Sequence, residues 1–283
     1  KFAVDRLDEG DYDTAYRLFN RMGGTDNMPE AQEKMGLIFE RGLGVPKNYE
    51  TALNWYNMSA FQGNVDAQMA LASLYYEGRG VKEDRAAALQ WYRKAAATGN
   101  PRAQERMGVL YYNGDIVVQD YREAFRWFRL SAQQGNASAQ ERLGTILRVG
   151  KEGIRENPQE AIIWYRKAAD AGIVGAQVDL ALLYEEGKGV AKNYTESFKL
   201  FEKAAAQGNA IAQGFLGVKY GFGQGVEQNT RLGYLWATLA ADDGDHKAKA
   251  LRDYLEKDMK PAEIAAAKKA AEACKASKFQ KCN

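Results

Sequence analysis

The sequence predicts an all-α protein, a right-handed α/α superhelical solenoid of about six 36-residue helical hairpins with capping helices at both ends. Four of the five tryptophans, Trp55, Trp91, Trp127 and Trp164, recur at intervals of 36, 36 and 37 residues, and Trp236 follows two periods later. An Ala-Gln pair and a glycine recur with the same period, which is the signature of a repeat architecture. No segment keeps the alternation of apolar and polar residues that a half-buried strand needs.

The Ala-Gln pair marks the start of each unit. The pairs are Ala31-Gln32, Ala67-Gln68, Ala103-Gln104, Ala139-Gln140, Ala176-Gln177 and Ala212-Gln213. They define six repeats, numbered 1 to 6, at residues 29–64, 65–100, 101–136, 137–173, 174–209 and 210–245. A helical hairpin this short cannot bury its own apolar face, so its stability is expected to come from stacking on its neighbours.

The first helix of a repeat is predicted from its apolar spacing. In repeat 2, Leu71, Leu74 and Tyr75 follow Ala67 on one helical face. A Gly-x-Gly sequence then ends the helix, because glycine adopts the positive φ that a helix C-terminus often needs. This pair of glycines is present in four of the six repeats.

The second helix is predicted to begin after a capping Asn or Asp, whose side chain accepts hydrogen bonds from the first backbone N–H groups. These residues are Asn48, Asp84, Asp120, Asn157, Asn193 and Asn229. Four residues later comes a small residue, then a Trp-Tyr pair in most repeats, then alanine. We expect the tryptophan of one layer to fill the space left by the Ala or Gly of the next.

The two ends of the chain differ from the repeats. Residues 1–28 contain the pattern of a second helix alone, with Asp11 at the cap and Ala15 in the small column, which predicts a capping half-repeat. Residues 246–283 are predicted to form C-terminal capping helices and a tail, with one helix beginning at Pro261.

The combined pattern of Ala-Gln, Leu-Gly, Gly-x-Gly-Val, a capping Asp or Asn, and Trp-Tyr-x-Lys-Ala-Ala resembles the Sel-one-like repeat, a relative of the tetratricopeptide repeat. The resemblance covers residues 29 to about 245. It implies a non-enzymatic adaptor or scaffold that binds a protein or peptide partner in a concave groove lined by the first helices, in signalling or cell-envelope assembly. The departures from the pattern are Ala72, Ala181, Ile116 and Leu200-Phe201.

The resemblance places recognition at variable positions of the first helices, here 2, 6 and 9 residues after the alanine of the Ala-Gln pair. The candidate binding residues are Met69, Ser73, Tyr76, Glu105, Tyr112, Glu141, Arg148 and Glu185. Tyr76, Tyr112 and Arg148 would form a ladder of the residue types that anchor interfaces. The alternative is that the tyrosines complete the packing between first helices. In Tyr75-Tyr76 and in Tyr111-Tyr112 one ring is expected to be buried and the other exposed.

Composition and motifs argue against several other functions. A net charge of +2, from 39 basic and 37 acidic residues, is far from the basic footprint of a nucleic-acid binder, and no apolar run is long enough to span a membrane. The single histidine, His246, has no evident catalytic or zinc-binding partners, and none of the six serines is followed three residues later by lysine. We therefore expect no catalytic residue, metal or cofactor. Glycan or peptidoglycan binding is the main alternative, because exposed aromatic rings suit sugar faces, and a hydrolase is the least favoured one.

Two cysteines, Cys274 and Cys282, lie eight residues apart near the C-terminus. They are either a disulfide pair or two unrelated surface thiols. A disulfide would indicate an oxidising compartment. Together with a chain that begins at Lys1 rather than Met, this leads us to expect a periplasmic or secreted protein whose signal peptide has been removed.

Overall fold

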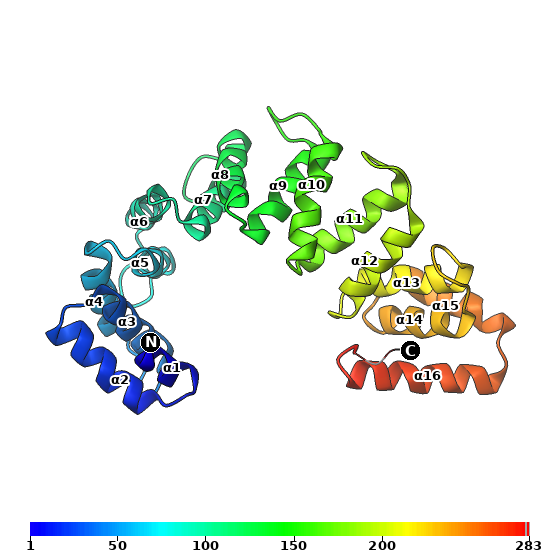
Figure 1. Cartoon of the computed structure of the whole chain (residues 1–283), viewed down its shortest axis with the longest axis horizontal. Coiled ribbons are helices and arrows are strands. Elements are labelled where there is room, and N and C mark those ends of the chain that lie inside the picture. The colour runs from blue at the N-terminus through cyan, green and yellow to red at the C-terminus, as the bar shows by residue number, and fades with distance from the viewer. Residues whose placement is uncertain (281, 283) are drawn as a thin grey trace. The chain divides into compact units, whose positions relative to one another are not determined.

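A computed structural model describes residues 1–280 and Cys282, which form helices, connecting loops and one isolated bridge between Lys151 and Ile154. The chain divides into two compact units, the first covering residues 1–136 and the second beginning at Ala137. Unit 1 contains the N-terminal helices and repeats 1 to 3 (Figure 1). Its α-helices are α1 (Phe2–Asp8), α2 (Tyr12–Asn20), α3 (Pro29–Arg41), α4 (Tyr49–Phe61), α5 (Val65–Glu77), α6 (Arg85–Ala97), α7 (Pro101–Asn113) and α8 (Tyr121–Gln133).

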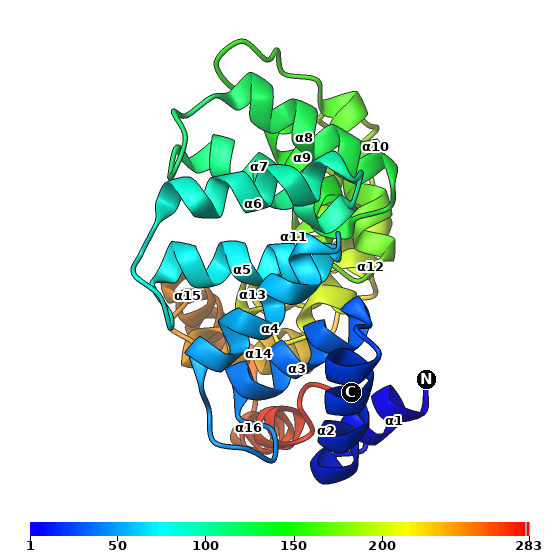
Figure 2. The same cartoon turned by 90° about the vertical axis from the view of Figure 1, so that its left-hand side faces the viewer.

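Unit 2 contains repeats 4 to 6 and the C-terminal helices. Its α-helices are α9 (Ala137–Val149), α10 (Pro158–Asp170), α11 (Val174–Glu186), α12 (Tyr194–Ala205), α13 (Ala210–Phe222), α14 (Thr230–Asp242), α15 (His246–Leu255) and α16 (Pro261–Ala276). Each repeat is one hairpin of a first and a second helix, and successive hairpins pack side by side within a unit. Figure 2 shows this stacking for α5, α6 and α7. The described residues thus form the all-α solenoid that the period predicts.

The capping residues predicted from the sequence begin the second helices as expected. In repeat 2, the Asp84 carboxylate accepts a hydrogen bond from the backbone N–H of Ala87 at 2.9 Å. Equivalent bonds are made by Asn48, Asp120, Asn157, Asn193 and Asn229. The first helix of repeat 2 ends at Gly78, whose φ of +65° lies in the left-handed region.

The second loop glycine allows one repeat to pack closely on the one before it. Gly80 has a φ of +71°, and a Cβ atom placed there would lie 2.5 Å from the Cβ of Tyr49 at the start of α4. In repeat 1, a Cβ at Gly44 would lie 2.7 Å from that of Tyr12 at the start of α2. The glycine therefore serves both the turn and the contact between repeats.

In repeats 1 to 5 a buried aromatic ring packs against the small residue of the first helix. This ring belongs to the residue directly after the tryptophan position of the second helix. Phe128 is fully buried, and a Cβ at Gly108 would lie 2.6 Å from its ring; Tyr56 stands in the same way against Gly36. The tryptophans lie between repeats instead: Trp127 packs on the cluster that contains Ala88 and Ala96 of repeat 2, and Trp91 on the cluster that contains Ala52 and Ala60 of repeat 1. This agrees with the prediction that a tryptophan of one layer fills the space beside small residues of the next. Neighbouring helical residues point about 100° apart, and the residue after the tryptophan is the one that faces the small column. Trp55, Trp91 and Trp127 are half-buried, whereas Trp164 and Trp236 are buried.

The glutamine that recurs in every repeat has a structural role in this chain. Gln68 is 1% exposed, and its side-chain N–H donates to the carbonyl of Ala60 in the preceding second helix at 3.2 Å. Gln177 makes the same bond to Ala169 at 3.2 Å. These buried amides satisfy backbone carbonyls at the end of one helix and so fix the position of the next repeat.

The ends of the chain depart from the prediction in one respect. Residues 1–28 contain α1 before the expected helix α2, and a π-helical turn, Arg21–Thr25, after it. Asp11 caps α2 as predicted, accepting from the N–H of Thr14 at 3.3 Å. At the other end α15 and α16 follow repeat 6, and α16 begins at Pro261 as predicted. The pattern of α1 was missed because its seven residues are too few to show a helical period.

Cys274 and Cys282 form a disulfide. Cys274 is fully buried in a cluster with Phe201 of α12 and Trp236 of α14. The bridged segment reaches the end of α12, where the side chain of Gln280 donates to the carbonyl of Ala206 at 3.2 Å. The disulfide therefore closes a loop at the end of α16, and within unit 2 this loop and α16 pack on repeats 5 and 6.

Candidate protein-binding face

The eight candidate binding residues predicted from the sequence are all half-buried. Tyr76 on α5 donates a hydrogen bond to Asp115 in the loop after α7. The guanidinium of Arg106 lies 5.6 Å from the centre of the Tyr76 ring. Tyr76 thus joins repeat 2 to repeat 3. Burial and the hydrogen bond to the Asp115 carboxylate raise its pKa, the hydrogen bond being the larger cause.

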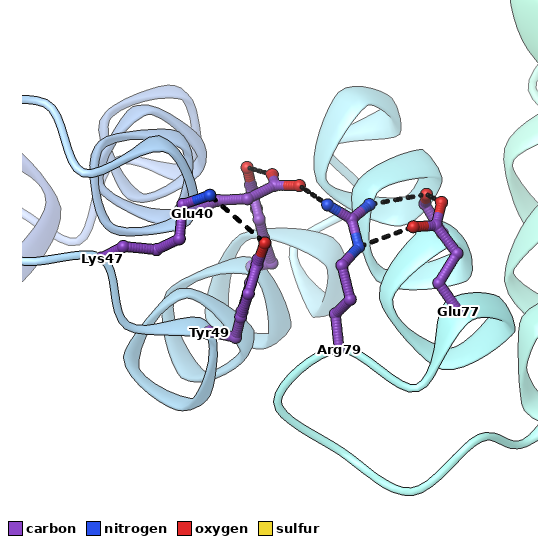
Figure 3. A network of polar contacts seen from close by, with 7 residues as sticks. Glu40, Lys47, Tyr49, Glu77 and Arg79 are labelled. Carbon is purple, nitrogen blue, oxygen red and sulfur yellow. Dashed lines mark hydrogen bonds and ion pairs between the residues drawn. The ribbon is translucent and has the colours of Figure 1, made fainter.

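The same position in repeat 1 is Glu40, and Figure 3 shows its polar network. Its carboxylate accepts hydrogen bonds from Tyr56 at 2.7 Å and from Arg79 of repeat 2 at 3.2 Å. Arg79 also pairs with Glu77 at 2.7 Å and donates to Ser73 at 3.3 Å. Ser73 is therefore part of a network that holds two repeats together.

In unit 2 the corresponding residues also contact the next repeat. Arg148 donates to the hydroxyl of Tyr165 at 3.2 Å and lies 3.8 Å from the Asp179 carboxylate of repeat 5. Glu185 pairs at 2.5 Å with Lys219, a lysine of repeat 6 that is only 1% exposed. The side chain nine residues after the alanine of the Ala-Gln pair therefore mostly contacts the following repeat. Sequence spacing could not reveal this, because it does not say on which side the next repeat lies.

The remaining tyrosines also differ from expectation. All four rings of Tyr75-Tyr76 and Tyr111-Tyr112 are half-buried, so neither pair divides into one buried and one exposed ring. The Tyr112 ring meets that of Tyr121 edge to face, with 5.3 Å between ring centres. Met69 packs against the apolar cluster of repeats 2 and 3, and Glu105 is half-buried on α7. These contacts fit the alternative, in which the tyrosines pack between helices, better than a row of tyrosines free to bind a partner.

Glu141 gives a pH-dependent prediction. Burial is the main cause that raises its pKa above the ordinary 4.5, and the Asp179 carboxylate acts in the same direction. A raised pKa means that folding disfavours the ionised side chain, so its cost is present at neutral pH and falls as pH drops through the raised pKa. Glu141→Gln is expected to increase the free energy of unfolding at pH 7, with a difference that vanishes below pH 4.5.

Chemical denaturation of both proteins between pH 4 and 7 measures this difference. The matched control is Glu186→Gln, which changes an exposed carboxylate at the end of α11. A stabilisation by Glu141→Gln that stays constant over the pH range would exclude the burial argument.

A different set of residues forms an exposed apolar row. Ile211, Phe215, Val218 and Phe222 follow one another on α13 at spacings of 4, 3 and 4 residues, which places them on one helical face. Ile211 is 56% exposed and Phe222 is 47% exposed. The Phe215 ring is held in place by the protein core, because it stacks on the ring of buried Phe201 with 4.4 Å between ring centres. We call these four residues the α13 row.

Helix α15 supplies the other side of this face. Together with α13 it lines a hollow of about 400 Å³, whose walls include Ile211, Phe215, Val218, Ala248 and Leu251. The absence of a side chain at Gly214 helps to open the hollow, which also borders Asp245 and Lys247. At the far end Tyr254, 52% exposed, lies 5.9 Å from Phe222 between ring centres.

The α13 row is unlike its counterparts. The same four positions carry at least two polar or charged residues in every other repeat. They are Glu30, Lys34, Leu37 and Arg41; Asp66, Ala70, Ser73 and Glu77; Arg102, Arg106, Val109 and Asn113; Ser138, Arg142, Thr145 and Val149; and Gly175, Asp179, Leu182 and Glu186. An exposed apolar surface of this kind is unusual on a folded protein, which makes the α13 row a candidate interaction site.

Sequence reasoning missed this face although its signal was present. The candidate residues chosen from the sequence lie 2, 6 and 9 residues after the alanine of the Ala-Gln pair. The α13 row instead lies one residue before Ala212 and 3, 6 and 10 residues after it. Comparing the repeats at these offsets would have singled out repeat 6 as the apolar one.

The described residues contain no group of three or more His, Cys, Asp or Glu side chains placed to hold a metal ion. Among the same residues, no helix has the length and apolar character needed to cross a bilayer.

The fold and the period define the class as an all-α repeat protein. The Sel1 repeat family model matches residues 29–64, 65–100, 101–136, 137–173, 174–209 and 210–245, so the chain belongs to the Sel1 repeat family. Proteins of this family are commonly protein–protein interaction scaffolds, and the solenoid is generally non-catalytic. No curated protein matches the sequence.

The chain is similar to several solved structures. A Sel1 repeat protein from Oxalobacter formigenes is 27% identical, with a TM-score of 0.72 over 91% of this chain and 98% of that one. A protective antigen of uropathogenic Escherichia coli with an SLR fold is 26% identical, with a TM-score of 0.40 over 95% of this chain and 72% of that one. An immunity protein from Pseudomonas aeruginosa is 19% identical, with a TM-score of 0.45 over 78% and 82%.

Proposed function

We propose that this protein is a non-enzymatic adaptor that binds a protein partner on the face formed by α13 and α15. The observation that carries the proposal is the α13 row, an exposed apolar surface in the one repeat where the equivalent positions are not polar. Aromatic anchors such as Phe222 and Tyr254 are typical of energetically important interface residues. The family's common role in protein interaction supports the same conclusion.

The geometry favours a protein over a sugar as the ligand. Sugar binding by stacking needs aromatic rings with open faces. In unit 1 the Tyr76 ring is contacted by Arg106 and Arg85, and the Tyr112 ring packs on Tyr121. The exposed residues of the α13 row combine aliphatic and aromatic side chains, a mixture suited to a protein surface.

We further propose that the protein works in an oxidising compartment, the periplasm or the exterior of the cell. The disulfide between Cys274 and Cys282 supports this, because such bonds persist mainly outside the reducing cytosol. A role in signalling or envelope assembly is compatible with that location.

The binding proposal is tested by a pair of matched substitutions. Ile211→Glu places a carboxylate in the α13 row, and Ile163→Glu makes the same change at an isoleucine of α10 that is 53% exposed. Burying one isoleucine contributes about 1.5–3 kcal/mol, so Ile211→Glu is expected to weaken partner binding at least tenfold, whereas Ile163→Glu leaves it unchanged.

The measurement is affinity capture from an extract of the producing cells, followed by titration of the captured partner by calorimetry. Circular dichroism should show that both variants stay folded, because each isoleucine is exposed. Equal binding by the two variants would remove the α13 row as the binding surface.

A further inference from the structure

We propose that the segment bound on the α13–α15 face is an amphipathic α-helix of the partner, with an apolar row along one side and a carboxylate that pairs with Lys247. This inference rests on the proposed function and specifies the conformation and charge of what is bound. It follows from the hydrogen-bonding capacity of the face, its length and the exposed ammonium of Lys247 at its border.

The first argument concerns backbone hydrogen bonds. The hollow is bounded by two helices, whose backbone groups bond within each helix, and by the side chains of Ile211, Phe215, Val218 and Leu251. An extended segment laid on this surface would lose water from its N–H and C=O groups without gaining partners. A helix satisfies its own backbone and presents side chains only, which is the usual mode of recognition in an apolar groove.

The second argument concerns dimensions. From Ile211 to Phe222 the α13 row spans eleven residues, or about 16 Å at 1.5 Å per residue. Three turns of a partner helix cover the same distance, with apolar side chains at i, i+4, i+7 and i+11. Gly214 leaves room between Ile211 and Phe215, where a partner side chain can enter the hollow.

The third argument concerns charge. Two ionisable residues border the hollow, Asp245 and Lys247. The Oδ1 atom of Asp245 caps α15 and accepts from the N–H groups of Lys247 and Ala248 at 2.8 and 3.1 Å, while Oδ2 lies beside Gly214. A carboxylate of the partner is therefore expected to lie on the Lys247 side of the hollow, away from Asp245. The exposed ammonium of Lys247 has no ion-pair partner in the part of the chain that the structure describes. A partner helix that matches this face has an apolar row along one side and a carboxylate at the end that lies next to Lys247.

The test uses a fluorescein-labelled synthetic helical peptide of about 15 residues with leucine at i, i+4, i+7 and i+11 and glutamates at the end that meets Lys247. Three control peptides are matched to it. One distributes the same leucines around the helix, one carries central prolines that prevent helix formation, and one replaces the glutamates by lysines. Fluorescence anisotropy with the full chain measures each affinity.

The acidic helical peptide is expected to bind at least about tenfold more tightly than the scattered and proline peptides, and to lose this advantage with Ile211→Glu but not with Ile163→Glu. Lys247→Glu should reverse the preference between the acidic and lysine peptides. Lys249→Glu, a neighbouring exposed lysine that lies 3.6 Å from Asp253, is the control that should leave the preference in place.

The outcomes separate this inference from the proposed function. Equal affinity for the proline and helical peptides, no binding of the helical peptide, or an unchanged charge preference in Lys247→Glu would overturn the helix and its carboxylate. The face would remain a protein-binding surface if Ile211→Glu still abolished partner capture. Self-association in sedimentation that Ile211→Glu abolishes would show that a second copy occupies the face, which also overturns the inference.

Discussion

Phe128→Ala is expected to lower the free energy of unfolding by about 3–5 kcal/mol, the range for removing a fully buried aromatic ring. Phe128 has no exposed surface, and its ring lies directly over Gly108. The ring fills the space between the two helices of repeat 3. Without it the hairpin is also expected to pack less well against the neighbouring repeats, which stabilise it. Chemical denaturation followed by circular dichroism measures the change.

A second substitution at the same contact tests the mechanism. Gly108→Leu alone should also destabilise repeat 3, because overpacking costs about 1–3 kcal/mol. In the double variant the leucine enters the space that the ring has left, so the combined loss should be smaller than the sum of the single losses. Repeat 6 shows a related solution, since Gly217 there faces Ala237 instead of a ring. Additive losses would mean that ring and glycine are not coupled.

Removal of the disulfide is expected to have the next largest effect on stability. Closing a loop of about eight residues constrains the unfolded chain by about 2.5 kcal/mol in the entropy model. Cys274 is also buried against Phe201 and Trp236, so the cost of Cys274→Ser includes a hydroxyl placed among apolar groups. The variant, or the reduced protein, should therefore unfold at a lower denaturant concentration.

Hydrogen exchange can localise that effect. Protection should fall in α16 and in the parts of α12 and α14 that it covers, while repeats 1 to 3 exchange as before. The double variant Cys274→Ala with Cys282→Ala, which avoids the buried hydroxyl, separates the constraint of the bond from the polarity of serine. Uniform loss of protection over both units would contradict a local role of the disulfide.

The repeats were predictable from the sequence because their signals are local. An Asn or Asp such as Asp84 caps the helix that begins beside it, and a glycine such as Gly78 ends the helix that precedes it. Which ring lies against Gly108, that of Trp127 or that of Phe128, is not decided locally. Both are aromatic and adjacent, and only the direction of the facing helix decides between them.

The candidate site was harder to predict for the same reason. Tyr76 and Glu185 were chosen for their variability and residue type, yet they contact Asp115 and Lys219 of the following repeats. These contacts span 39 and 34 residues, and helical periodicity within one repeat does not contain them. The α13 row, in contrast, can be recognised in the sequence. When the same four positions are compared between repeats, they are all apolar in repeat 6 alone.

Site-specific photocrosslinking tests most directly whether α13 and α15 bind a protein. A photoreactive phenylalanine analogue is placed at Phe222 in one sample and at Phe61, an aromatic of α4 that is 72% exposed, in the other. After illumination with the partner present, we expect a crosslinked complex from position 222, lost with Ile211→Glu, and none from position 61. A complex formed from position 61 but not from position 222 would contradict it.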